Sequence, residues 1–124
     1  MDADDAHHAE SVRLLQDHPG PLLVPILTVT EVTYFIQTRL SAAAEVRFLG
    51  DLSSGSLLVE PVLPPDWLRI AELVWRYRDL PLGTVDASVV AASERLGIVG
   101  IATFDRRHFG VVRPAHTESF ELLP

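Results

Sequence analysis

Short apolar segments alternate with longer stretches of helical periodicity along this chain of 124 residues. Leu22–Val24, Ser56–Val62 and Ile98–Thr103 have the apolar composition of buried strands. The predicted helices run from Asp4 or Asp5 to about Asp17 and over 25–40, 42–52, 64–77 and 84–96, and a last edge strand is predicted over 120–123. Because apolar strands separated by helices are typical of parallel sheets covered on both faces, the alternation predicts an α/β fold with a short parallel sheet.

Three of the predicted helices carry apolar stripes that we expect to face the core. The inward residues are predicted to be Val29, Val32, Ile36 and Leu40 in the first, Trp67, Ile70, Leu73 and Val74 in the second, and Val85, Val89, Ala92 and Leu96 in the third. Further apolar side chains flank the first stripe, so helix 25–40 is predicted to be buried almost all round.

The charge of the chain limits the partners it can have. A formal net charge of −7 argues against a protein that coats nucleic acid non-specifically. Residues 95–113 hold four arginines and one acid, Asp105, and form the one basic surface that the sequence offers. The absence of cysteine excludes a thiolate metal site and suits a reducing compartment, so we expect a cytoplasmic protein. The longest apolar stretch is interrupted by Pro25 and is far shorter than the ~20 residues of a membrane span.

Three carboxylates stand at unusual places in this pattern. Glu31 lies in an apolar helix, Asp86 lies in the first turn of helix 84–96, and Asp105 follows the last apolar strand. Each has a structural explanation of its own: a salt bridge to an arginine for Glu31, an interaction with the helix dipole for Asp86, and an Asx-turn or helix cap for Asp105.

If the three carboxylates converge, their mutual repulsion calls for a divalent cation. Oxygen ligands without cysteine favour Mg²⁺ or Mn²⁺ over zinc. Such a site hydrolyses phosphodiesters, and Arg106 and Arg107 directly after Asp105 are placed to hold the phosphate backbone of the substrate.

Four stretches resemble the PIN-domain ribonucleases, specifically the VapC-like toxins of bacterial toxin–antitoxin pairs. They are DADDAHHAE, TVTEVTYFIQTRL around Glu31, LGTVDASVVAASERLG around Asp86 and IATFDRRHFGVVRP around Asp105. The resemblance implies a PIN-like three-layer α/β domain that cleaves RNA with Mg²⁺ or Mn²⁺ bound by Glu31, Asp86 and Asp105, with Thr103 as a supporting hydroxyl. It also implies a homodimer and a cognate VapB-like antitoxin that blocks the site.

The chain departs from the family at its start. The family opens with an apolar central strand that ends in an aspartate, a principal metal ligand, whereas Met1 stands here where that strand has already ended. We therefore expect a single domain over residues 1–124 that lacks the first strand and is poorly stable unless another segment fills the gap.

Two other classes of protein remain open. One is a catalytically impaired PIN-like module that binds antitoxin or RNA without cleaving it. The other is an unrelated α/β domain in which all three acids are caps or salt-bridge partners. The two tryptophans, Trp67 and Trp75, are predicted to pack in the core or at a dimer interface rather than to stack on bases.

Overall fold

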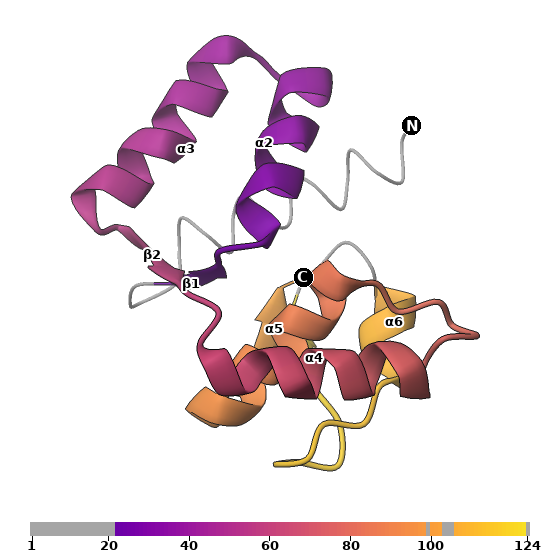
Figure 1. The fold of residues 1–124 in the computed structure, drawn as a ribbon. Helices are drawn as coiled ribbons and strands as arrows, with labels where there is room; N and C mark the ends of the chain where they lie inside the picture. Colours follow the sequence, from indigo (N-terminus) through magenta and orange to yellow (C-terminus); the bar gives the residue numbers. More distant parts are fainter. Residues whose placement is uncertain (1–21, 99, 103–105, 124) are drawn as a thin grey trace.

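The computed structural model describes residues 22–98, 100–102 and 106–123 (Figure 1). Its elements in chain order are β1 (Leu22–Pro25), α2 (Thr28–Arg39), α3 (Ala42–Ser54), β2 (Leu57–Glu60), α4 (Pro64–Arg76), α5 (Thr84–Leu96), β3 (Gly100–Ala102), α6 (Arg106–Val111) and β4 (Glu121–Leu123). The predicted α/β class is thus confirmed, and the predicted helix that ends near Asp17 lies outside the described residues.

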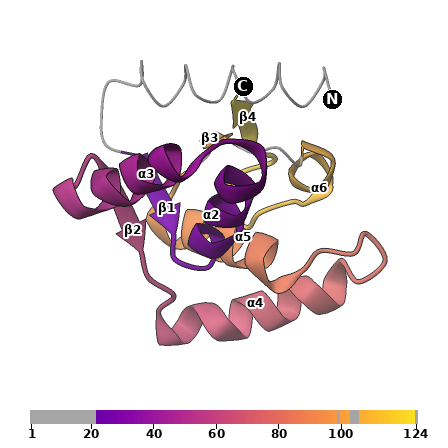
Figure 2. The ribbon, with the colours of Figure 1, turned by 90° about the horizontal axis from the view of Figure 1, so that it is seen from above.

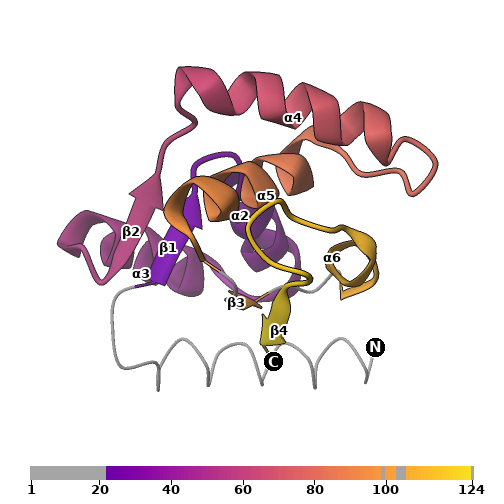
Figure 3. The same ribbon diagram turned by 90° about the horizontal axis from the view of Figure 1, so that it is seen from below.

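All strand pairing in the described part of the chain is parallel, as predicted. β1 pairs with β2 in a register that places Leu22 opposite Leu57, and β3 pairs with β4 in a register that places Ile101 opposite Leu122. The described strands form two separate pairs rather than one continuous sheet. Figure 3 shows α5 between α4 and the pair β3–β4, so helices and strands lie in layers.

The first described helix begins later than the predicted residue 25. Pro25 is still a strand residue opposite Glu60, and the Ile26 N–H donates to the Glu60 carbonyl at 2.8 Å. The Thr28 hydroxyl then donates to the Pro25 carbonyl at 2.7 Å. Strand pairing therefore extends past the proline, and the helix begins only at Thr28.

Local signals mark the start of α3 and the ends of α3 and α5. Ser41 accepts a hydrogen bond from the Ala44 N–H at 3.1 Å and caps α3. Gly55 after α3 and Gly97 after α5 have φ angles of 85° and 70°, which residues with a β-carbon rarely adopt. These two glycines turn the chain out of each helix towards the following strand.

The main core lies between α4, α5, α6 and the C-terminal segment. The buried members of this cluster are Ile70, Leu73, Leu82, Ala87, Val90, Ala91, Phe109, Val112 and Phe120. The rings of Phe109 and Phe120 meet edge to face, with 6.1 Å between their centroids. This cluster fixes α5, which carries Asp86, against the rest of the domain.

The predicted inward faces are correct only in part. Ile70 and Leu73 are buried as predicted, but Trp67 is 50% exposed and lies on the outside of α4. In α5 Ala92 is buried as predicted, but the most buried residues are Ala87, Val90 and Ala91, and Leu96 is exposed.

Helix α2 was predicted to be buried almost all round, but most of its side chains are exposed or only partly buried. Ile36 is its buried residue, while Tyr34 is 68% exposed. The reason is that α2 packs mainly against α3 and β1, which cover one side of it (Figure 1). None of the described helices is both long and apolar enough to cross a membrane.

Candidate functional site

Two of the three predicted acids lie at the starts of neighbouring helices. Glu31 is in the first turn of α2 and Asp86 is in the first turn of α5. In the view from above α2 lies over α5 (Figure 2), and both helices contact β1, although β2, α3 and α4 separate them in the chain. The fold therefore brings together two carboxylates that are 55 positions apart in the sequence (86 − 31).

The two carboxylates influence each other electrostatically. The pKa of the Glu31 carboxyl is raised, first by partial removal from water and second by the negative charge of Asp86. The Glu31 side chain as a whole remains exposed, whereas Asp86 is half-buried. The raised pKa is the response expected of a carboxylate that faces a like charge.

Glu31 also lines a hollow on the outer side of α2. The lining residues are Thr30, Glu31, Tyr34, Phe35, Thr38 and Arg39. Their spacing places Glu31, Phe35 and Thr38 on one face of the helix, as the sequence predicts. The surface beside the Glu31 carboxylate therefore contains hydroxyl groups and aromatic rings.

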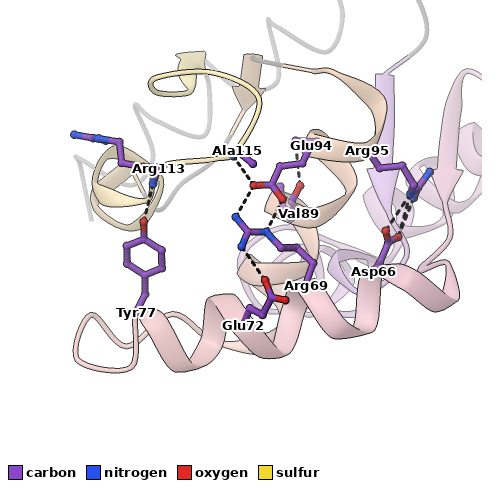
Figure 4. Close-up of polar contacts among 10 residues, drawn as sticks. Asp66, Arg69, Glu72, Tyr77, Val89, Glu94, Arg95, Arg113 and Ala115 are labelled. Atoms are coloured by element: carbon purple, nitrogen blue, oxygen red, sulfur yellow. Dashed lines mark hydrogen bonds and ion pairs between the residues drawn. The ribbon is translucent and has the colours of Figure 1, made fainter.

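Other acids near α4 and α5 are held in ion pairs. Glu94 accepts two hydrogen bonds from Arg69, and Asp66 accepts hydrogen bonds from Arg95 (Figure 4). Glu31 makes no hydrogen bond or ion pair within the described part of the chain, so the predicted alternative of a salt bridge to an arginine is not observed there. Glu31 thus differs from the acids that hold the fold together.

The remaining predicted site residues are not placed by the structure. Asp105 and Thr103 lie outside the described residues, and the side chains of Arg106 and Arg107, which begin α6, lie outside them as well. Within the described ranges, no group of three histidine, aspartate or glutamate side chains is arranged to hold a metal ion. The structure therefore brings together Glu31 and Asp86 and leaves Asp105 as a prediction.

The expected basic surface over 95–113 needs a correction. Arg95 does not contribute to it, because its guanidinium donates to Glu60 at 2.8 Å and to Asp66 at 3.1 Å. Arg76 and Arg78 at the end of α4 are exposed, and sequence reasoning did not select them. The signal in the sequence is the run Trp75-Arg76-Tyr77-Arg78, in which basic and aromatic residues alternate.

Comparisons with known proteins agree with the resemblance seen in the sequence. A family model described as PIN domain matches residues 1–113. A curated relative, Ribonuclease VapC26 of Mycobacterium tuberculosis (strain ATCC 25618 / H37Rv), is 29% identical to the chain over 124 residues. That match covers 100% of this chain and 92% of the relative.

Proposed function

The chain belongs to the PIN-domain family, and we propose that it is a VapC-like toxin, an endoribonuclease that hydrolyses RNA phosphodiester bonds with the help of Mg²⁺ or Mn²⁺. The relative named Ribonuclease VapC26, which aligns over the full length of this chain, supports the reaction class. The observation that carries the proposal is the charge of Asp86 acting on Glu31 across the gap between α2 and α5.

The residues at this gap fit a hard divalent cation. Both donors are carboxylates, which are the ligands that Mg²⁺ and Mn²⁺ prefer. Glu31 has no hydrogen-bond donor competing for its oxygens among the described residues, and a cation would offset the charge of Asp86, which adds to the effect of burial in raising the pKa of Glu31. When bound, such a cation activates water and offsets negative charge on the phosphate.

We assign the ligand roles to Glu31, Asp86 and Asp105. Glu31 lies in the first turn of α2 and Asp86 in the first turn of α5, and both helices contact β1. Asp105 is the proposed third acid, and Thr103 the hydroxyl that supports it. Arg106 and Arg107 bind the RNA backbone in this proposal, since guanidinium groups pair with phosphate in a bidentate manner.

The proposed biological setting follows from the same family. We assign the activity to a single domain formed by residues 1–124, which works in the cytoplasm as a homodimer. A VapB-like antitoxin is proposed to inhibit it by covering the carboxylates.

A cleavage assay with the full chain tests the proposal. A structured RNA is incubated with the protein and Mg²⁺ or Mn²⁺, and cleavage should stop on addition of EDTA. Glu31→Gln, Asp86→Asn and Asp105→Asn should each slow cleavage by roughly 100-fold or more, because each removes charge from the cation site. Glu118→Gln, a change of an exposed acid in the C-terminal segment, is the matched control.

The result also separates the competing protein classes. RNA binding without cleavage by the wild-type chain would identify a binding module that has lost activity. Cleavage that persists in both Glu31→Gln and Asp86→Asn would place the reaction elsewhere in the protein.

A further inference from the structure

Three exposed arginines gather around the C-terminal end of α4. They are Arg76, Arg78 and Arg113, and none of them has a carboxylate partner in the part of the chain that the structure describes. Arg69 and Arg95, by contrast, are held by Glu94 and by Asp66 with Glu60. The end of α4 therefore presents guanidinium groups that the fold does not use for ion pairs.

Tyr77 brings the most distant of these arginines to the helix. The Tyr77 hydroxyl oxygen accepts a hydrogen bond from the backbone N–H of Arg113 at 2.9 Å (Figure 4). The guanidinium carbon of Arg76 lies 5.5 Å from the centroid of the same ring. Tyr77 thus contacts the guanidinium of Arg76 and the backbone of Arg113, and the Arg113 Nη1 donates to the Gly110 carbonyl at 2.9 Å.

Trp75 adds an exposed aromatic surface. Its side chain is 69% exposed, and the guanidinium carbon of Arg78 lies 4.1 Å from the centroid of its ring. Arg78 is fixed there because its Nη1 donates to the Trp75 carbonyl at 2.8 Å. Of the two predicted places for Trp75, the core is therefore wrong and the dimer interface stays a prediction, and most of the indole is exposed in the single chain.

The local charge is opposite to that of the whole chain. Asp79 is the one acid in the segment 75–79, while Glu72 one turn earlier is held by Arg69 at 3.2 Å. Three arginines against one aspartate leave a local excess of two positive charges in a chain whose formal net charge is −7. A local positive charge of this kind attracts a polyanion.

We infer that Trp75, Arg76, Arg78 and Arg113, the α4-end cluster, bind single-stranded RNA, with a base stacked on Trp75 and phosphates held by the three arginines. Exposed aromatic rings beside basic side chains are the arrangement by which proteins bind single strands without reading their sequence. This inference rests on the proposed function, since it supplies a second contact for the RNA that the carboxylates cleave.

The α4-end cluster lies at the same end of the α4–α5 hairpin as Asp86. The Leu82 N–H donates to the Tyr77 carbonyl at 3.1 Å, which folds the connecting loop back onto the end of α4. Asp86 follows four residues after Leu82, in the first turn of α5. One RNA strand can therefore contact the α4-end cluster and continue towards the carboxylates.

Binding of a labelled RNA tests the inference directly. The full chain carrying Asp86→Asn is titrated into a fluorescein-labelled, unstructured RNA of about 12 nucleotides, and anisotropy gives the Kd. Adding Trp75→Ala should raise the Kd roughly 5- to 150-fold, the range expected for the loss of one stacked base. Trp67→Ala is the matched control, because this tryptophan is also exposed on α4 but lies at its other end, and it should change the Kd less than twofold.

The salt dependence of binding tests the arginines. The logarithm of the binding constant falls as the logarithm of the salt concentration rises. Arg76→Ala, Arg78→Ala and Arg113→Ala should each make this slope less steep by about 0.7, the value for one phosphate contact on a single strand. Arg47→Ala, which removes the same charge from the exposed side of α3, should leave the slope unchanged.

The outcomes separate this inference from the proposed function. Equal Kd values for Trp75→Ala and Trp67→Ala, with cleavage still dependent on Asp86, would overturn the inference alone. Binding that depends on Trp75 in a chain that never cleaves RNA would overturn the proposed activity alone. A change of sedimentation mass in Trp75→Ala, with RNA affinity unchanged, would instead identify the α4-end cluster as a protein interface and reject RNA.

Discussion

Arg69 and Glu94 join α4 to α5 through two parallel hydrogen bonds, from Nε to Oε1 at 2.7 Å and from Nη2 to Oε2 at 2.9 Å (Figure 4). Oε2 of Glu94 also accepts a hydrogen bond from the backbone N–H of Ala115 at 2.6 Å. One carboxylate therefore holds two helices and the C-terminal segment together. This contact keeps α5, and with it Asp86, fixed relative to α4.

We predict that Glu94→Gln lowers the free energy of unfolding by about 1–3 kcal/mol, because the partly buried guanidinium of Arg69 loses its better-buried carboxylate and keeps only Glu72. The midpoint of urea unfolding measures this loss. Glu72→Gln is the control, since Glu72 bonds the same arginine but its side chain is 55% exposed, and it should cost less than about 0.5 kcal/mol. Equal losses in the two variants would show that burial of Glu94 is irrelevant.

The stability of the protein should fall in acid because two structural carboxyls have lowered pKa values. Burial opposes ionisation of Asp66 and Glu94, but hydrogen bonds from Arg95 and Arg69 outweigh it and bring both pKa values below their ordinary values of 3.8 and 4.5. A group whose pKa is lowered by folding contributes stability above its unfolded pKa and loses it as the pH falls through its folded pKa. Urea midpoints measured from pH 7 down to pH 3 should therefore decline below about pH 4.5, and less steeply in Asp66→Asn.

Glu31 should have the opposite effect on stability. Its pKa is raised above 4.5 by partial burial and by Asp86, so the contribution of Glu31 is present at low pH and lost as the pH rises through the raised value. We predict that Glu31→Gln raises the Tm of the EDTA-treated protein at pH 7 by the order of 1–2 °C, and that the gain disappears at pH 4. Glu118→Gln serves as the exposed control. A lower Tm in Glu31→Gln at pH 7 would mean that Glu31 is a stabilising residue of the fold.

Leu73 and Leu68 on α4 provide a matched test of the core. Leu73 is fully buried, whereas Leu68 is 70% exposed. We predict that Leu73→Ala costs about 2–5 kcal/mol in urea unfolding, because it removes buried apolar surface and leaves a cavity. Leu68→Ala should change the free energy of unfolding by less than about 0.5 kcal/mol. A large loss in Leu68→Ala would show that its side chain is covered in solution.

The order of elements could be predicted from the sequence because each has a local cause. Pro64 and Pro65 start α4, Gly97 ends α5, and the apolar runs give the strands. Which face of each helix is buried could not be predicted, because it depends on the neighbouring elements. Tryptophan is a large apolar residue that often lies in a core. Trp67 and Trp75 are nevertheless exposed, because α5 packs against another face of α4.

Part of the candidate site could also be predicted from the sequence. The sequence marks Glu31 as a carboxylate in an apolar helix and Asp86 as an acid at a helix start, and in the fold burial and the charge of Asp86 together raise the pKa of Glu31. Trp75, Arg76 and Arg78 of the α4-end cluster are close in the sequence, but the membership of Arg113 could not be predicted, because it depends on the tertiary hydrogen bond to Tyr77. The ion pairs of Arg95 could not be predicted either, because its partners Glu60 and Asp66 are 35 and 29 positions away in the sequence.

The central claim is that Glu31 and Asp86 share a divalent cation. Calorimetric titration of the purified full chain with Mn²⁺ measures this most directly, because it needs neither a substrate nor cleavage. Mn²⁺ should bind the wild-type protein and Glu118→Gln with the same Kd, and Glu31→Gln and Asp86→Asn should each weaken binding by about tenfold or more. If both variants bind Mn²⁺ as tightly as the wild-type protein, the two carboxylates do not form a cation site.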